Sequence, residues 1–293
     1  DLKMWKPENY GKKFYGPSTI RTGVEKSRNL MTVRIAQEIG TEKIAKFAQS
    51  LNIYNNPENL LSISLGSAET TLLKLTAAYS SFVNGGKLIE PILLDRIQDS
   101  EGNTIFSTEK RICEKCTQIS YLGNEIPKIK DNFVQIISEE TAYQITSILE
   151  GAIKRGTGRG LNDLNLDLAG KTGTTNDNTD AWFIGFTSNL VIGVYVGHDE
   201  PKTLGKYETG SKTAMPIFKS FIKNAIKKGD ARPFKVAKNI KFLVIDQKTG
   251  KKADFGSKTT IIEAYKKNNL KNNLLANDDL NMKVGKNNIL KFY

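Results

Sequence analysis

The order of secondary-structure patterns along this 293-residue chain predicts an α+β fold, in which helices flank an antiparallel sheet. Three observations lead to this prediction. Amphipathic helical spacing comes first, short apolar strands then follow one another at 169–174, 181–186 and 190–196, and a basic amphipathic helix covers 214–228. A composition of 39% hydrophobic and 25% charged residues indicates a globular protein, and the length allows a substantial buried core.

Capping residues and glycines delimit the predicted helices of the N-terminal part. Ser18 supplies a side-chain oxygen that can cap the first helix, and Gly40 and Gly85 provide stops for two later ones. Between these signals, apolar residues recur at the spacing of one helical face. The four helices predicted in this way cover 18–26, 29–40, 41–48 and 72–83.

A segment rich in turn residues separates these helices from the sheet. Alternating residues at 92–105 predict a hairpin, and 107–131 is polar and loop-like. This loop contains both cysteines of the chain, Cys113 and Cys116, and a zinc site would need a second pair of ligands. Their C-x-x-C spacing is consistent with a local disulfide in an oxidising compartment or with an incidental surface pair.

Two further helices enclose the strands in sequence. Ser138 can cap the first, acidic residues follow in its first turn, where the helix dipole favours anions, and the glycine-rich run 156–160 ends it. The second is the helix at 214–228, whose amphipathic pattern predicts one buried face. The residues expected to face inward from it are Ile217, Phe218, Phe221, Ile222, Ala225 and Ile226.

The chain divides into a predicted domain at 1–229 and a basic extension at 230–293. The extension holds 14 Lys or Arg against six Asp or Glu, two strand-like pieces at 240–245 and 259–264, and an Asn- and Lys-rich end expected to be partly disordered. The net charge of +12 suits an anionic partner, but aromatic residues are sparse in the extension and no nucleic-acid motif occurs. We therefore predict a solvated basic surface and no nucleic-acid partner.

The strand Lys171-Thr-Gly-Thr174, followed by a Trp-containing strand, has the clearest chemical pattern. In an extended strand the lysine and the glycine share one face, and the two threonines share the other. The glycine removes side-chain bulk where a substrate or a neighbouring helix must come close. Since the single histidine, His198, is interpreted as structural, serine chemistry here would need a lysine base with a lowered pKa.

A second short motif, Ser27-Arg-Asn29, precedes this strand. Each triplet by itself is a weak signal, because Ser50-Leu-Asn52 and Lys248-Thr-Gly250 repeat the two patterns elsewhere in the chain. The second of these repeats is predicted to be a β-turn. The longer sequences that surround the two triplets are far more specific.

Those longer sequences resemble class A penicillin-binding proteins. The similarity runs from about Trp5 to about Lys228, and the tail to about Tyr265 resembles the family's C-terminal extension. It implies the transpeptidase fold shared by penicillin-binding proteins and serine β-lactamases. The matching stretches are Phe14-Tyr-Gly-Pro-Ser-Thr-Ile-Arg21, Glu25-Lys-Ser-Arg-Asn-Leu-Met-Thr-Val-Arg34, Thr141-Ala-Tyr-Gln-Ile-Thr-Ser147, Gly170-Lys-Thr-Gly-Thr-Thr-Asn-Asp177 and Asp180-Ala-Trp-Phe-Ile-Gly-Phe186.

The resemblance implies a D,D-transpeptidase, which attacks the D-Ala-D-Ala end of a peptidoglycan stem peptide, forms an acyl-enzyme and passes the acyl group to a neighbouring stem. By motif match, Ser27 would relay a proton toward the leaving amine and Asn29 would hold the substrate's amide. Lys171 would hold Ser27 in its hydrogen-bond network and favour the terminal carboxylate.

The substrate-binding residues implied by the resemblance are Thr172, Gly173 and Thr174. The two threonine hydroxyls would bind the terminal carboxylate, and the Thr174 N–H would supply half of an oxyanion hole. The expected partners are peptidoglycan stem peptides and β-lactams, with no cofactor and no metal. The expected location is the periplasm, at the outer face of the cytoplasmic membrane.

The family's nucleophile motif, Ser-x-x-Lys, has no counterpart before Ser27. The matches at Ser107–Lys110 and Ser220–Lys223 come in the wrong order and are interpreted as chance. We therefore expect an N-terminally truncated domain that lacks the nucleophile and is inactive alone. Its parent protein would be anchored to the membrane by a segment outside this sequence.

Two alternatives remain open. One is a non-catalytic module that binds stem peptides or β-lactams, which the missing nucleophile would explain. The other is a β-lactamase, which fits less well because no water-activating Glu motif is visible. The sequence assigns neither the stem-peptide chemistry, the oligomeric state nor the protein partners.

Overall fold

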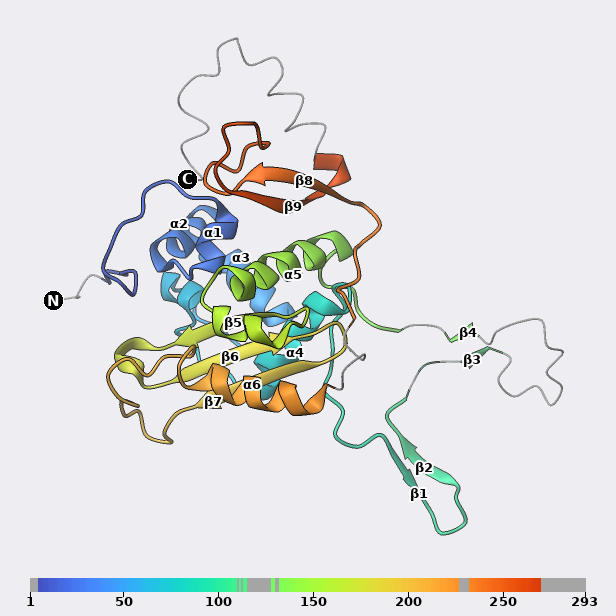
Figure 1. The fold of residues 1–293 in the computed structure, drawn as a ribbon. Coiled ribbons are helices and arrows are strands. Elements are labelled where there is room, and N and C mark those ends of the chain that lie inside the picture. The colour runs from blue at the N-terminus through green and yellow to red at the C-terminus, as the bar shows by residue number, and fades with distance from the viewer. Residues whose placement is uncertain are drawn as a thin grey trace.

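The computed structural model describes residues 5–109, 111, 113–114, 128–129, 132–226 and 232–269. Helices and an antiparallel sheet form its body, which confirms the α+β prediction (Figure 1). Successive strands of this sheet pair antiparallel in the order β5-β6-β7, as predicted. The strands are β5 (Ala169–Thr174), β6 (Ala181–Phe186) and β7 (Val191–Val196).

Helices cover both faces of this sheet, and side chains of β6 point alternately to each face. The helices are α4 (Leu72–Val83), α5 (Glu139–Lys154) and α6 (Ala214–Ala225). Phe183 is fully buried against Phe218 of α6, with ring centroids 4.8 Å apart. On the other face Phe186 packs against Tyr79 of α4, and Leu149 of α5 joins the same cluster. Because both faces are covered, β6 is apolar throughout.

The predicted N-terminal helices are present, with one corrected cap. Gly40, with φ +94°, ends the second helix as predicted. The first helix is capped by Thr19 rather than Ser18, because Thr19 Oγ1 accepts a hydrogen bond from Thr22 N at 3.2 Å. Ser18 Oγ accepts instead from the guanidinium of Arg28. The predicted helices are α1 (Ile20–Glu25), α2 (Asn29–Ile39) and α3 (Thr41–Ser50), and the 3-10 helix η1 (Leu61–Leu65), which was not predicted, follows them.

Helix α6 buries a narrower stripe than its sequence suggests. Phe218 and Ile222 are fully buried, but Ile217 and Phe221 are 50% and 54% exposed and Ala225 is also exposed. The prediction that these last three face inward is therefore wrong. A helix that packs on one face of a small sheet buries residues four apart, and their flanking neighbours stay at the edge of the contact.

Two small two-stranded sheets lie between α4 and α5 in the sequence. The hairpin predicted at 92–105 is present and projects from the body (Figure 1). The segment 107–131, predicted to be loop-like, contains a pair of two-residue strands, and Cys116 lies outside the described residues, as does any pairing of the cysteines. The four strands are β1 (Arg96–Gln98), β2 (Thr104–Ser107), β3 (Cys113–Glu114) and β4 (Lys128–Ile129).

A C-terminal hairpin lies against α5 on the side away from the sheet (Figure 1). Its strands, β8 (Ile240–Asp246) and β9 (Thr260–Lys266), confirm the two strands predicted in the extension. Ala237, Ile240 and Ala264 form a buried cluster with Tyr143 of α5. The predicted domain boundary at 229/230 and the Asn- and Lys-rich end from residue 270 lie outside the described residues.

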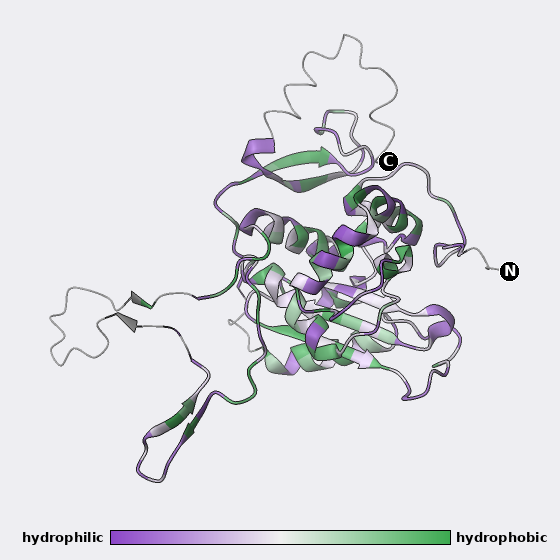
Figure 2. Ribbon diagram, turned by 180° about the vertical axis from the view of Figure 1, so that it is seen from behind, coloured by the Kyte–Doolittle hydropathy of each residue, from purple (hydrophilic) through white to green (hydrophobic). Residues whose placement is uncertain are grey.

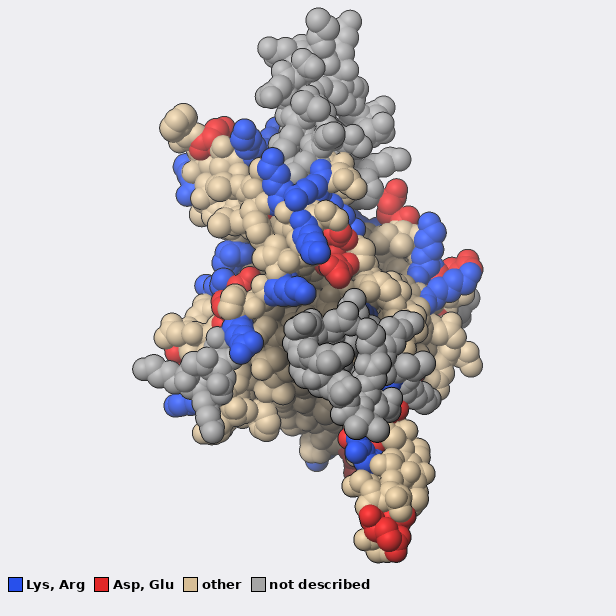
Figure 3. Space-filling view, turned by 90° about the vertical axis from the view of Figure 1, so that its right-hand side faces the viewer, with Lys and Arg blue, Asp and Glu red and all other residues tan. Residues whose placement is uncertain are grey.

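Apolar and charged residues are distributed differently over the structure. Figure 2 shows apolar residues along the sheet, on the helices that pack against it, and on the β1–β2 and β8–β9 hairpins. On the face seen in Figure 3, Lys and Arg side chains are scattered and interleaved with Asp and Glu. Among the described residues, no helix is long and apolar enough to span a membrane.

Candidate active site

The structure brings Ser27 and Lys171 into direct contact, although they lie far apart in sequence. Lys171 Nζ donates hydrogen bonds to Ser27 Oγ at 2.5 Å and to the carbonyl oxygen of Thr172 at 3.0 Å. Ser27 follows α1, which packs on α5, and Lys171 lies on β5, which packs on the same helix. The contact between Ser27 and Lys171 therefore depends on α1 and β5 both packing against α5.

Ser27 has an unusual backbone conformation. Its φ of +54° lies in the left-handed region, which favours glycine. The hydrogen bonds from Ser27 N to the Val24 carbonyl and from Arg28 N to the Gly23 carbonyl, at 3.1 and 2.9 Å, form a Schellman motif at the end of α1. This motif usually has glycine where the chain has Ser27. The benefit of the serine hydroxyl is therefore expected to outweigh the cost of the backbone strain.

Substitution of Ser27 tests this strain. In a helix interior, glycine is less stable than alanine by about 0.5–1 kcal/mol. At Ser27 we expect the opposite order, with Ser27→Gly more stable than Ser27→Ala by about 1 kcal/mol, because only alanine keeps the Cβ in a left-handed conformation. Urea unfolding of the two variants measures the difference. Equal stabilities, or a more stable alanine variant, would contradict the strained conformation.

Lys171 is a half-buried cation that has no anionic hydrogen-bond partner among the described residues. Its two partners are the neutral hydroxyl of Ser27 and a backbone carbonyl. Burial therefore disfavours its charged form and lowers its pKa from 10.5 to about 8. A lysine that is partly uncharged near neutral pH can take part in proton transfer.

This pKa predicts how stability depends on pH. Between pH 8 and 10.5 the unfolded Lys171 holds a proton that the folded one has lost, so the free energy of unfolding rises with pH in this window. We expect the stability of the wild type relative to Lys171→Met to rise there by on the order of 3 kcal/mol. Chemical denaturation at several pH values measures this difference, and a difference that stays constant from pH 7.5 to 10.5 would exclude the lowered pKa.

The two threonines of β5 each have a partner that the sequence analysis did not identify. Thr172 Oγ1 is hydrogen-bonded to Thr157 Oγ1 at 2.9 Å, and Thr174 Oγ1 accepts from Gly210 N at 3.0 Å. Thr157 belongs to the glycine-rich run after α5, which was interpreted only as a helix stop. No comparable sequence signal pointed to Gly210.

Gly173 lies where two backbones come close. A methyl group at Gly210 would lie 2.4 Å from the Gly173 carbonyl oxygen, so the backbone at Gly210 lies directly against β5. A methyl group at Gly173 would itself lie 3.0 Å from Trp182 Cβ on β6. The neighbour that a side chain at Gly173 would meet is Trp182 of the adjacent strand, and the approach of a substrate to Gly173 stays a prediction.

Asn29 is the first residue of α2, and its Nδ2 donates to the Glu8 carbonyl at 2.9 Å. This bond ties it to the N-terminal segment. Its predicted contact with the substrate's amide stays a prediction. His198 is exposed after β7.

Neither chance match to Ser-x-x-Lys lies beside Ser27. Ser107 ends the projecting β1–β2 hairpin, and its partner Lys110 lies outside the described residues (Figure 1). Ser220 is exposed on α6, which covers the face of the sheet opposite to α5. The Ser27–Lys171 pair therefore has no nucleophile from these two motifs.

Solved structures of penicillin-binding proteins share this architecture. Penicillin-Binding Protein 1A from Haemophilus influenzae is 33% identical with a TM-score of 0.75, over 89% of this chain and 42% of that chain. The PonA1 protein from Mycobacterium tuberculosis, solved in complex with penicillin V, is 21% identical and shows the same fold. Its TM-score is 0.61, over 78% of this chain and 61% of that chain.

Sequence comparison identifies the family directly. The family described as "Penicillin binding protein transpeptidase domain" matches residues 1–223. Penicillin-binding protein 1A of Rickettsia conorii is 44% identical over 281 residues, which is 95% of this chain and 35% of that protein. The same-named protein of Pseudomonas aeruginosa is 32% identical, over 90% of this chain and 36% of that protein. The chain belongs to this transpeptidase domain family and spans about a third of the length of these relatives.

Proposed function

We propose that this chain is the larger, C-terminal part of a peptidoglycan D,D-transpeptidase domain, a penicillin target that cross-links stem peptides. The hydrogen bond from Lys171 Nζ to Ser27 Oγ at 2.5 Å is the observation that supports this most directly. A serine hydroxyl beside a lysine with a pKa of about 8 can accept and release a proton during acyl transfer. Membership of the transpeptidase domain family supports the same function.

In the proposed reaction, the nucleophile is a serine with a lysine base, supplied by a segment that precedes this chain in its parent protein. The serine attacks the carbonyl of the penultimate D-Ala and gives its proton to that lysine. As the C–N bond breaks, Ser27 passes its proton to the leaving D-Ala amine and takes the proton held by the lysine base. Asn29 holds the substrate's amide, and the Thr174 N–H stabilises the oxyanion by about 3–4 kcal/mol. The acyl group then passes to the amine of a neighbouring stem peptide.

The free carboxylate of the terminal D-Ala is proposed to bind along β5. Thr174 Oγ1 accepts from Gly210 N, which leaves its own proton free to be donated to a carboxylate. Thr172 can do the same when Thr157 is the donor of their shared bond. A Lys171 charge at about 4 Å adds up to ~4 kcal/mol at an effective dielectric of about 20, which selects substrates with a free C-terminus.

Fluorescent penicillin tests this proposal. The full-length protein that contains this chain is expected to be labelled covalently at a serine before Asp1, and the 293-residue chain alone is expected to stay unlabelled. Labelling of the chain alone at any of its serines would overturn the proposed division of the site. A full-length protein that no penicillin labels would overturn the transpeptidase function.

The missing nucleophile also supports a second candidate, a module that binds stem peptides or β-lactams without turnover. The coding DNA upstream of Asp1 distinguishes the two. A Ser-x-x-Lys motif within about a hundred codons favours the enzyme, at the domain size typical of such folds. A start codon with no such motif favours the binding module.

The parent protein is proposed to act at the outer face of the cytoplasmic membrane, where peptidoglycan precursors are cross-linked. A segment outside this chain would anchor it there. Fractionation of cells that express the full-length protein with a C-terminal tag tests this location, since a cytoplasmic pool that resists external protease would contradict it.

A further inference from the structure

The β8–β9 hairpin is held on α5 by specific polar contacts as well as apolar packing. Gln144 Nε2 donates to the Ala264 carbonyl at 2.8 Å, and Lys266 Nζ donates to Thr141 Oγ1 at 2.6 Å. These bonds run along the outer side of α5, whose inner side packs on β5. The hairpin is therefore fixed relative to the helix that supports the active-site strand.

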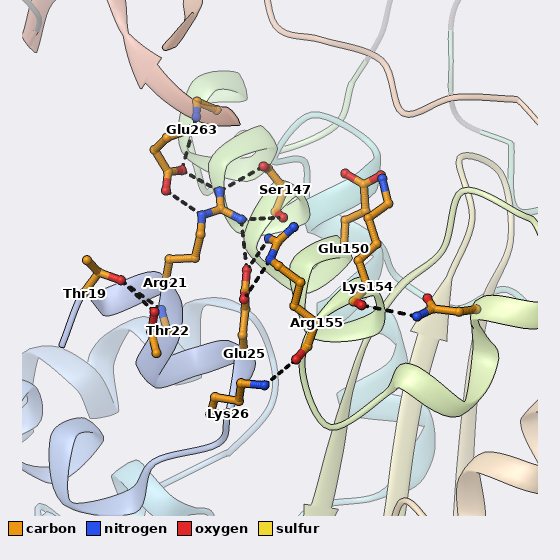
Figure 4. Close-up of polar contacts among 12 residues, drawn as sticks. Thr19, Arg21, Thr22, Glu25, Lys26, Ser147, Glu150, Lys154, Arg155 and Glu263 are labelled. Atoms are coloured by element: carbon orange, nitrogen blue, oxygen red, sulfur yellow. Dashed lines mark hydrogen bonds and ion pairs between the residues drawn. The ribbon is translucent and has the colours of Figure 1, made fainter. Parts of the chain in front are cut away.

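From this position Glu263 of β9 reaches α1 (Figure 4). Its two carboxylate oxygens accept from Nε and Nη2 of Arg21, both at 2.5 Å. The other Arg21 N–H groups go to Ser147 O at 2.9 Å, Ser147 Oγ at 3.0 Å and Glu25 Oε1 at 3.4 Å, so all five guanidinium donors are used. Because Arg21 is only 4% exposed, its charge depends on these partners rather than on water.

Glu25 extends the network to the end of α5. It is fully buried and accepts from Arg155 Nη2 at 2.5 Å and from Arg155 Nε at 3.2 Å (Figure 4). Gly151 makes room for it, since a methyl group there would lie 1.9 Å from Glu25 Oε1. Two arginines and two glutamates thus form an electrically neutral set around α1.

The backbone of Glu25 connects this set to the active-site pair. The Glu25 carbonyl accepts from Thr157 N at 3.1 Å, and Thr157 Oγ1 is bonded to Thr172 Oγ1. Two residues after Glu25, the chain turns through the left-handed conformation of Ser27 to meet Lys171. A displacement of α1 therefore moves both Ser27 and Thr157 relative to β5.

We propose that Glu263 is a positioning residue for the transpeptidase reaction: through Arg21 it holds α1 so that Ser27 stays within hydrogen-bond distance of Lys171. This inference rests on the proposed function. Without Glu263, Arg21 keeps a single anionic partner among the described residues, Glu25, which also accepts hydrogen bonds from Arg155. The C-terminal hairpin then contributes to the geometry of the active site as well as to the stability of the domain.

The variant Glu263→Gln distinguishes the positioning of Ser27 from a general contribution of Glu263 to the stability of the domain. Glutamine has the same length but no charge and one acceptor oxygen, so the two-point contact with Arg21 is lost. Lys266→Met is the matched control, because it removes a contact of the same strand with α5 and leaves Arg21 paired. Thermal unfolding of both variants shows how much stability each contact contributes.

Two measurements report on position rather than stability. In the full-length protein, the NMR titration of Lys171 Cε is expected to shift its midpoint by about half a pH unit or more in Glu263→Gln and to stay unchanged in Lys266→Met. In the full-length protein, the maximal acylation rate with fluorescent penicillin is expected to fall about tenfold in Glu263→Gln. The half-saturating penicillin concentration is expected to change less than about twofold.

Three results decide the inference. Wild-type values of both measurements in Glu263→Gln overturn it, and so does an equal loss of rate in Lys266→Met. If Glu263→Gln does not fold, Glu263→Asp keeps the charge but withdraws the carboxylate, and a rate loss of about threefold is expected; an unchanged rate overturns the inference. If penicillin fails to label the wild type, the proposed function fails, and the Lys171 titration still decides whether Glu263 positions Ser27.

Discussion

Replacing Glu25 by glutamine is expected to lower the free energy of unfolding by about 3–5 kcal/mol. Glu25 is fully buried, and its carboxylate accepts from both Arg21 and Arg155. The substitution leaves Glu263 as the one anion of this network, in contact with Arg21 but not with Arg155, and it turns an amide N–H₂ toward the donors of both arginines. Arg155 is partly exposed, which places the expected loss at the lower end of the range. Urea denaturation followed by circular dichroism measures it.

Glu42→Gln is the matched control for this prediction. Glu42 and Lys46 form an ion pair on one helix face, as Arg21 and Glu25 do, but both side chains are largely exposed. No measurable change in stability is expected from the loss of such a surface pair. If the Glu25 and Glu42 variants unfold at the same denaturant concentration, the buried network does not support the fold in the way described here.

Replacing Lys171 by methionine in the full-length protein is expected to slow acylation by penicillin about 10²–10³-fold. The change removes the hydrogen bond to Ser27 and the charge proposed to attract the substrate's carboxylate. The fold is expected to persist, since the half-buried lysine has no anionic hydrogen-bond partner among the described residues and a methionine of similar length fills its space. Stopped-flow acylation together with thermal unfolding separates the two effects.

The chain contains its own control for this substitution. Lys248 begins a second Lys-Thr-Gly triplet, and it is exposed in the turn of the β8–β9 hairpin. Lys248→Met is expected to acylate at the wild-type rate. An acylation rate of Lys171→Met within about threefold of the wild type would exclude the proposed role, because a lost charge-assisted contact at a reacting group costs more than that.

Much of the fold followed from local sequence signals. Ser138 Oγ accepts from Thr141 N at 3.3 Å and so caps α5 as predicted, and the strands of the sheet were predicted to within one residue. These signals act between close neighbours, so they can be read without knowing the fold. The errors at Ser18 and on α6 arise where a local signal does not decide the outcome. Two hydroxyls compete for one cap in the first case, and the width of the buried stripe depends on the sheet beneath it in the second.

The candidate site was only partly predictable. The motifs containing Ser27 and Lys171 could be found because serine, lysine and glycine at fixed spacings are recognisable wherever they occur. Thr157 and Gly210 were missed as partners of β5, because a hydroxyl or a glycine N–H gives no signal until another element lies against it. The roles of Asn29 and of the threonines stay predictions for the experiments above.

Sequence alone determined the elements of this protein, their order and the family to which its motifs point. Tertiary structure alone decided which charges meet in the interior. Glu263 lies 242 positions from Arg21, yet the two make the contact that ties the C-terminal hairpin to the helix before Ser27. The lowered pKa of Lys171 arises in the same way. Burial and charge pairing depend on the distance between atoms after folding, and no local pattern of residues records that distance.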